Sequence, residues 1–138
     1  MARPYRLQIE NGLYHITSRG NERRQIYLDD SDYKKFLEYV GKAKEKYKVY
    51  LYAYVLMSNH YHLLIETTQE NLSHLMHYLN GSYTSYFNWK HKRHGHLFQG
   101  RYKSILVDKE TYFMELTRYI HLNPVKAKMV EDPLKYPW

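Results

Sequence analysis

The segment KVYLYAYVLMSNHYHLLIET, residues 48–67, decides the fold predicted for this chain. Its first half, residues 48–57, is apolar or aromatic at nearly every position, which indicates a strand in the middle of a sheet with both faces covered. Ser58 and Asn59 are turn residues. Beyond them two sets of side chains alternate: Tyr61, Leu63 and Ile65 on one face, and His60, His62 and Glu66 on the other. The segment therefore predicts a β-hairpin with a polar stripe on its second strand, residues 60–67.

Regular elements are predicted on both sides of this hairpin. Residues 13–19 form a short β-branched and aromatic run, which predicts a first strand. Asp29 or Asp30 caps a helix that runs to about residue 46, because its apolar positions follow the i, i+3, i+4, i+7 spacing. A second long helix begins at Leu72 and ends in the basic, histidine-rich residues 90–96. Residues 103–107 predict a fourth strand, and Asp108 caps a last helix that includes Ile120.

The predicted order of elements is βαββαβα, and it places the chain in the α+β class. A four-stranded, mainly antiparallel sheet of the ferredoxin-like or RNA-recognition-like kind fits this order, with an added C-terminal helix. The 138 residues contain no repeat or linker, so we expect one domain over residues 1–138. Folds of this kind serve many functions, so the function has to be inferred from the site.

The composition indicates a polyanionic partner. Lys and Arg number 21 against 14 Asp and Glu, which gives a net charge of +7 and a pI of about 9.4. Seventeen tyrosines offer stacking faces for unpaired bases, although amphipathic core packing also explains them. Nucleic acid is the expected partner.

Targeting signals and cysteines are absent from the sequence. No apolar run reaches the roughly 18 residues of a membrane span, and the N-terminus lacks the pattern of a signal peptide. We therefore expect a soluble, cytoplasmic protein with no membrane partner. With no cysteine, any metal has to be bound by His, carboxylate or amide groups.

His60 and His62 are the first candidate metal ligands. Side chains at i and i+2 of a strand point to the same face, about 6–7 Å apart along the backbone, so two imidazoles can converge on one ion. The alternative is two ordinary polar residues on a solvent-facing strand edge. The strongly apolar strand before them favours a position near the sheet centre, and so favours the metal.

Tyr119 and Asn123 lie on the last predicted helix, one turn apart. Tyr119 is on the apolar face of that helix, where a core tyrosine is the ordinary interpretation. An amide oxygen of Asn123 would lie beside the phenol as a third metal ligand. Asn123 also precedes Pro124, and this pair is typical of the start of a new short helix. Spacing leaves both interpretations of Asn123 open.

Four ordered blocks carry a family resemblance across nearly the whole chain. They are YHITSRGN (14–21), VLMSNHYHLL (55–64), HLFQGRYK (96–103) and RYIHLNPV (118–125). With them the sequence resembles the single-tyrosine HUH transposases, and most of all the REP-associated tyrosine transposases of bacteria. The resemblance implies a bacterial, nucleoid-associated protein that acts as a monomer or as a homodimer. The chain ends at Trp138, where related chains are expected to continue.

The resemblance also implies a reaction. His60 and His62 match the histidine pair of the family, and Asn123 matches the third ligand of Mg²⁺ or Mn²⁺. Tyr119 matches the nucleophile that attacks single-stranded DNA, keeps the 5′-phosphate and releases a 3′-hydroxyl. A phosphotyrosine conserves the energy of the phosphodiester, so the strands can later be rejoined.

DNA hairpins with a short single-stranded flank are the substrates that the resemblance implies. Basic residues supply the expected DNA contacts: Arg19, Arg23, Arg24, Lys92, Arg93, Arg101 and Lys103. Each of them singly is also consistent with a solvated surface charge.

Three other functions share parts of this pattern. A rolling-circle replication initiator of the HUH class also uses His-x-His and a tyrosine, although residues 118–125 favour the transposase. A non-catalytic single-stranded nucleic-acid-binding module would stack bases on the tyrosines and would bind in EDTA. A hydrolase that activates water with the histidine pair would cleave without a protein adduct.

Overall fold

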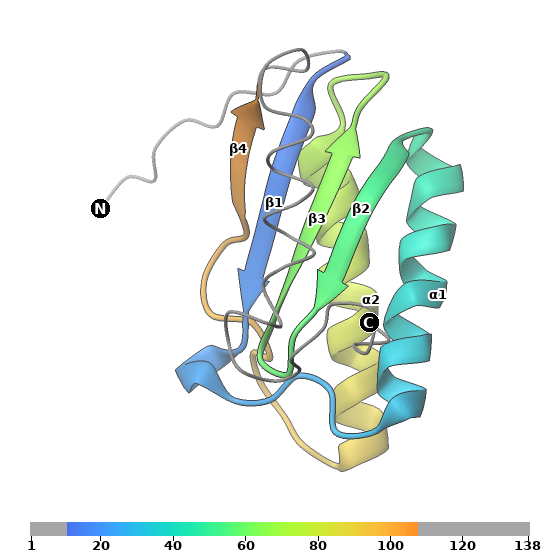
Figure 1. The fold of residues 1–138 in the computed structure, drawn as a ribbon. Helices are drawn as coiled ribbons and strands as arrows, with labels where there is room; N and C mark the ends of the chain where they lie inside the picture. Colours follow the sequence, from blue (N-terminus) through green and yellow to red (C-terminus); the bar gives the residue numbers. More distant parts are fainter. Residues whose placement is uncertain (1–10, 108–138) are drawn as a thin grey trace, which may run out of the picture.

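The computed structural model describes residues 11–107, in which a four-stranded sheet packs with one face against two long helices (Figure 1). The elements are β1 (Leu13–Arg19), the 3-10 turn η1 (Asn21–Arg23), α1 (Asp30–Tyr47), β2 (Tyr50–Leu56), β3 (His60–Glu66), α2 (Leu72–His91) and β4 (Lys103–Val107). The strand order is β2-β3-β1-β4, and all three neighbouring pairs are antiparallel. The α+β class and the ferredoxin-like sheet are confirmed. The last helix predicted, after Asp108, lies outside the described residues.

The position of β2 differs from the prediction. We expected residues 48–57 in the middle of the sheet, and this is wrong, because β2 is an edge strand and the central strands are β3 and β1. The run is apolar because β2 has buried side chains on both of its faces. Leu56 packs on the helix side, and Ala53 and Val55 are buried on the other face. At the edge itself Tyr50 and Tyr52 are exposed. Burial of two faces and position in the sheet are separate properties.

The turn between β2 and β3 is fixed to the segment that follows β1. Ser58 and Asn59 form the predicted turn, and their carbonyls accept hydrogen bonds from Ile26 N and Gly20 N, both at 2.8 Å. A Cβ on Gly20 would lie 2.2 Å from the carbonyl oxygen of Arg24, so only glycine allows this approach. The end of the hairpin is thereby held against β1.

Both helices begin and end close to their predicted positions. Asp29 caps α1 by accepting a hydrogen bond from Asp32 N at 3.0 Å, and Lys48 ends it in the left-handed conformation, with φ of 55°. Lys92 ends α2 in the same way, with φ of 53°. No helix within residues 11–107 has both the length and the apolar character needed to cross a membrane.

A buried carboxylate joins the two helices. Asp32 has no solvent exposure, and its oxygens accept hydrogen bonds from Leu28 N, Tyr86 Oη, Lys90 Nζ and His91 Nε2, at 2.8 to 3.0 Å. Burial by itself would raise the pKa of Asp32, but these donors outweigh it and hold the pKa below its ordinary value. The C-terminal end of α2 is thus fixed to the start of α1.

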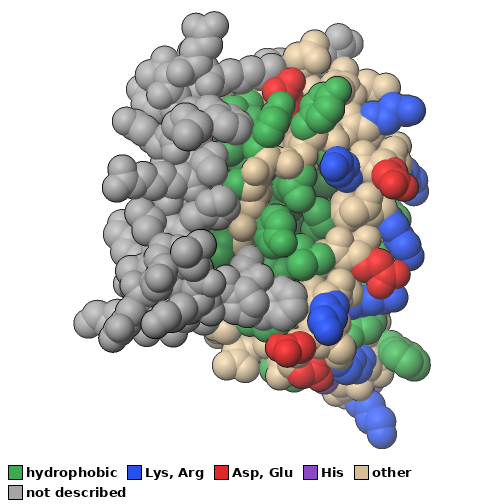
Figure 2. Space-filling view, turned by 45° about the vertical axis from the view of Figure 1, so that its right-hand side comes forward, with side chains coloured by type: hydrophobic (Ala, Val, Ile, Leu, Met, Phe, Trp, Pro, Cys, Tyr) green, Lys and Arg blue, Asp and Glu red, His purple; other side chains and the backbone are tan. Residues whose placement is uncertain are grey.

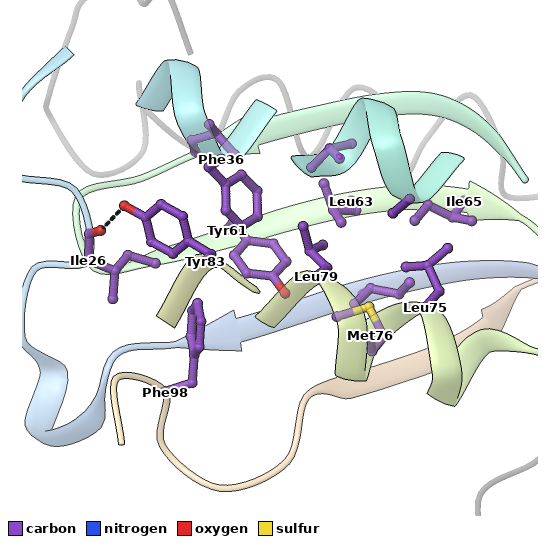
Figure 3. Close-up of a cluster of buried hydrophobic side chains, with 14 of the residues drawn as sticks. Ile26, Phe36, Tyr61, Leu63, Ile65, Leu75, Met76, Leu79, Tyr83 and Phe98 are labelled. Atoms are coloured by element: carbon purple, nitrogen blue, oxygen red, sulfur yellow. Dashed lines mark hydrogen bonds between the residues drawn. The ribbon is translucent and has the colours of Figure 1, made fainter. Parts of the chain in front are cut away.

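The core between the sheet and the helices is largely aromatic. Figure 3 shows Phe36 from α1, Tyr61 from β3 and Tyr83 from α2 lying together, with Phe98 from the segment after α2 beside them. Ring centroids lie 4.7 Å apart for Phe36 and Tyr61 and 5.9 Å apart for Tyr61 and Phe98. The Tyr83 hydroxyl donates to the Ile26 carbonyl. Several tyrosines are therefore core residues and are not available to stack with bases.

Candidate active site

The histidine pair lies on the face of the sheet opposite the two helices. Tyr61, Leu63 and Ile65 of β3 belong to the core on the helix side, so the alternation of a strand turns His60 and His62 the other way. Their ring centroids are 5.1 Å apart, with the planes at 81°. Because β3 is a central strand, the predicted shared face near the sheet centre is present.

Hydrogen bonds fix which nitrogen each ring offers. His60 Nδ1 lies 2.8 Å from Asn59 Oδ1, which only accepts, so Nδ1 carries the proton and Nε2 carries the lone pair. His62 Nδ1 lies 2.9 Å from His15 Nε2 and 3.2 Å from Thr17 Oγ1. Metal coordination through His62 Nε2 would leave both of these contacts in place.

The sequence interpretation did not include His15 and Thr17, which β1 places beside His62. In the antiparallel register Thr17 is paired directly with His62, and His15 is paired with Leu64. The rings of His15 and His62 are stacked, with centroids 5.1 Å apart. The alternation of residues 13–19 already placed His15 and Thr17 on one face of their strand. The register between the two strands was the missing information.

Both imidazoles are neutral at pH 7. Burial, with the neighbouring His60 and His15 adding to it, lowers the pKa of His62 to about 3. Burial, and then the charge of Arg19, lowers the pKa of His60. A neutral imidazole has the lone pair that metal coordination requires.

The pair opens into a hollow of about 560 Å³ with a basic lining. Its lining residues are Thr17, Ser18, Arg19, His60, His62, Gln99, Gly100, Arg101 and Lys103. Three of these carry positive charge, and no carboxylate from residues 11–107 lines the hollow. Backbone bonds hold its two sides together, since Gln99 N donates to Arg19 O at 2.8 Å. Such a hollow suits an anionic ligand.

The other predicted DNA contacts lie outside this hollow. Arg23 and Arg24 are exposed after β1, and Lys92 is exposed at the end of α2. Arg93 donates to Asn88 Oδ1 at 2.8 Å, and its guanidinium lies 5.9 Å from the centroid of the Phe87 ring, so it has a role in packing. The structure thus brings together only three of the seven basic residues predicted.

The positive charge is not spread evenly over the molecule. Figure 2 shows a side of the molecule on which Lys and Arg side chains alternate with Asp and Glu along a border, with apolar side chains gathered beside them. Ion pairs of this mixed kind join Lys35 and Lys42 to Glu38 on α1. The hollow with the histidines differs, because the charged residues among 11–107 that line it are all basic.

Tyr119 and Asn123 lie outside the described residues. Within residues 11–107, no group of three or more His, Asp or Glu side chains could hold a metal ion. A metal ion at His60 and His62 would therefore need further ligands, from water, from a substrate or from other parts of the chain.

Comparisons with known proteins agree on one family. A family model described as "Transposase IS200 like" matches residues 8–123. A structure of a REP-associated tyrosine transposase bound to a REP hairpin is similar over all of this chain and 81% of its own, with 19% identity and a TM-score of 0.82. A transposase candidate from Deinococcus radiodurans R1 covers 87% of this chain, and 94% of its own chain is matched, with 19% identity and a TM-score of 0.58. No curated protein matches the sequence.

Proposed function

Because the chain belongs to the IS200-like transposase family, whose model matches residues 8–123, we propose that it nicks and rejoins single-stranded DNA beside a hairpin. One observation carries the proposal. Two neutral imidazoles, His60 and His62, share a hollow to which the described part of the chain contributes three cations and no carboxylate. A phosphodiester is the anion that fits both features, and the similar transposase that was solved with a REP hairpin supports DNA as its source.

His60, His62 and Asn123 would hold a divalent ion, Mg²⁺ or Mn²⁺. The fixed ring nitrogens fit this role, because both Nδ1 atoms are engaged and coordination then falls to Nε2. Hard Mg²⁺ prefers oxygen ligands, so two imidazoles favour Mn²⁺. When bound, the ion supplies Lewis-acid polarisation of the scissile phosphate.

Tyr119 would act as the nucleophile. Its phenol oxygen forms a bond to phosphorus, and the bond between phosphorus and the 3′-oxygen breaks. The phenol loses its proton, and the departing 3′-oxygen gains one. The products are a 5′-phosphotyrosine and a free 3′-hydroxyl, and the reverse reaction joins strands.

Basic residues of the hollow would position the DNA. Arg19, Arg101 and Lys103 converge there and bind the scissile phosphate and its neighbours. Arg23, Arg24, Lys92 and Arg93 would contact the phosphates of the hairpin outside the hollow. Their contribution is electrostatic and falls as salt is added.

A covalent-capture assay tests the reaction. A pool of labelled hairpin oligonucleotides with random single-stranded flanks is incubated with protein and Mn²⁺, and adducts are resolved on a denaturing gel and sequenced. We expect an adduct with the wild type, none with EDTA and none with Tyr119→Phe. Tyr50→Phe is the matched control, because Tyr50 is exposed at the far edge of the sheet, and it should give the wild-type amount.

Other results identify the alternative functions. Cleavage without an adduct would indicate hydrolysis by activated water. Binding that EDTA leaves unchanged, with no cleavage, would indicate a non-catalytic binding module. An adduct that survives Tyr119→Phe would refute the assignment of the nucleophile.

A further inference from the structure

Three polar side chains form a hydrogen-bonded cluster in the core, which we call the Asn80 cluster. Tyr61 Oη on β3 donates to Asn80 Oδ1 on α2 at 2.6 Å, and Asn80 Nδ2 donates to Ser18 Oγ on β1 at 3.1 Å. Tyr61 and Ser18 are both buried. The cluster therefore connects the two central strands of the sheet to one helix.

The strand register places the Asn80 cluster directly behind the candidate metal ligands. Ser18 is paired with Tyr61 across β1 and β3. His60 and His62 are the neighbours of Tyr61 along β3, and the alternation of a strand turns them to the opposite face of the sheet. A contact that holds Tyr61 and Ser18 from the helix side therefore also holds the backbone from which the two imidazoles extend.

The helix that carries Asn80 is itself held at both of its ends. Near its start, Asn71 Nδ2 donates to the carbonyl oxygen of Tyr47 at 3.0 Å. At its C-terminal end, His91 Nε2 lies 2.8 Å from the buried carboxylate of Asp32. Both contacts fix α2 to α1, so a side chain in the middle of α2 is a firm point of attachment for the strands.

Helix propensity and packing do not by themselves favour an asparagine at this position. Asn80 is the ninth of twenty residues in α2, and asparagine forms helix interiors less well than leucine or methionine. Its neighbours Met76 and Leu79 pack in the apolar core. The amide adds hydrogen bonds in two directions, to Tyr61 and to Ser18, and a satisfied polar network of this kind makes a core more rigid.

Water could replace these hydrogen bonds chemically, but it could not hold the strands. Asn80 lines a hollow of about 510 Å³ on the helix side of the sheet, between α2 and residues 95–102. In an alanine variant, water from this hollow could form a hydrogen bond with the Tyr61 hydroxyl. The free energy of unfolding should then change little, whereas the fixed connection between α2 and the strands would be lost.

We propose that Asn80 is a positioning residue for His60 and His62, which it holds in place through Tyr61 and Ser18. Two imidazoles bind one ion only while their Nε2 atoms keep a set separation, and such groups have to be held within about 0.5 Å of the productive geometry. Asn80 supplies this restraint from the opposite face of the sheet. The metal part of this assignment rests on the proposed function.

Asn80→Ala and Asn71→Ala are a matched pair of variants. Each removes one asparagine amide from α2, but Asn71 lies beyond the end of β3 that is remote from His60. Tyr61→Phe is a third variant, which removes one hydroxyl and keeps the ring in the core. Urea unfolding shows that each variant is folded, and we expect similar, small decreases in the midpoint for the two asparagine variants.

Isothermal titration calorimetry of the intact chain with Mn²⁺ gives the first readout. We expect Asn80→Ala to weaken Mn²⁺ binding about fivefold and Tyr61→Phe about threefold, while Asn71→Ala stays within about twofold of the wild type. The double variant Asn80→Ala/Tyr61→Phe should bind Mn²⁺ as Asn80→Ala does, because both changes remove the same contact.

Proton–carbon NMR spectra of the histidine rings give a second readout, in the metal-free chain. Asn80→Ala should shift the ring signals of His60 and His62 and leave those of His94 unchanged, since His94 is exposed after the end of α2. Asn71→Ala should leave the ring signals of all three histidines in place.

Equal Mn²⁺ affinity for Asn80→Ala and Asn71→Ala, with both folded, would refute the proposal. Unchanged ring signals of His60 and His62 in Asn80→Ala would refute it as well. If the wild type binds no Mn²⁺, the metal site of the proposed function is refuted, and the NMR comparison alone then decides whether Asn80 positions the two histidines.

Discussion

The contact between His15 and His62 leads to a quantitative prediction about metal affinity. For His62 to coordinate through Nε2, its Nδ1 has to carry the proton and donate it. His15 Nε2 at 2.9 Å and Thr17 Oγ1 at 3.2 Å are the acceptors that the structure provides. Groups that receive the second N–H of a metal-binding histidine fix its tautomer and its orientation. Removing them should weaken Mn²⁺ binding without touching a metal ligand.

The expected size follows from the hydrogen bonds. One such bond contributes about 1 kcal/mol, which corresponds to roughly a fivefold change in affinity. His15→Ala removes the shorter bond and should weaken Mn²⁺ binding by about five- to tenfold. The double variant His15→Ala/Thr17→Val removes both acceptors, about 2 kcal/mol together, and should weaken it by about thirtyfold. His15→Gln retains an acceptor near Nε2 and should stay within about threefold of the wild type.

Isothermal titration calorimetry with Mn²⁺ measures these affinities on the intact chain. Urea unfolding of each variant checks that the protein is folded at the titration temperature. Equal Mn²⁺ affinity for His15→Ala and the wild type, with both folded, would refute the role of His15. The same conclusion would follow if His15→Gln lost as much affinity as His15→Ala, because the loss would then reflect packing and not an acceptor.

Four further predictions concern stability and DNA binding. Asp32→Asn breaks the buried carboxylate cluster and should lower the free energy of unfolding by about 3 kcal/mol in urea titrations, whereas exposed Asp30→Asn should cost under about 1 kcal/mol. Because folding lowers the pKa of Asp32, its carboxylate contributes fully to the free energy of unfolding above about pH 4, and this contribution is lost as the pH falls through the folded-state pKa. In that pH range the urea midpoint of the wild type should therefore fall more steeply than that of Asp32→Asn. Gly20→Ala should cost about 1–3 kcal/mol, since its Cβ meets a backbone oxygen, and an unchanged thermal midpoint would contradict this. Arg101→Ala should reduce the slope of log K against log salt by about 1 in hairpin titrations, and Lys42→Ala on α1 should leave it unchanged.

The sequence predicted most of the fold because hydrophobic periodicity and end residues are local signals. The bounds of β1 and β4 agree with the structure, and Asp29 caps α1 as expected. The order of strands in the sheet is a different kind of information. Residues 50–56 are mostly apolar because side chains are buried on both faces of this strand. Such a pattern does not show whether the strand has a neighbouring strand on each side within the sheet.

Less of the site could be predicted, for a similar reason. The i, i+2 spacing of His60 and His62 is sufficient to place both on one face, and the structure has them so. Their contacts with His15 and Thr17 depend on the register between two strands, which no local pattern encodes. The charge of Arg93 predicts a DNA contact, which stays a prediction. Its hydrogen bond to Asn88 depends on the left-handed end of α2, which the sequence pattern did not show.

The hydrogen bonds that assemble the histidine hollow are made by the backbone. Gly20 N donates to Asn59 O, Asn21 N to Leu97 O, and Gln99 N to Arg19 O, each at 2.8 Å. Main-chain donors and acceptors are the same for nearly every residue type, so the side chains at these positions, Gly20 excepted, can be exchanged while the backbone hydrogen bonds persist. Related proteins that share these backbone hydrogen bonds can change which DNA they prefer by single substitutions of residues that line the histidine hollow. The two histidines would meanwhile keep their place on the central strand.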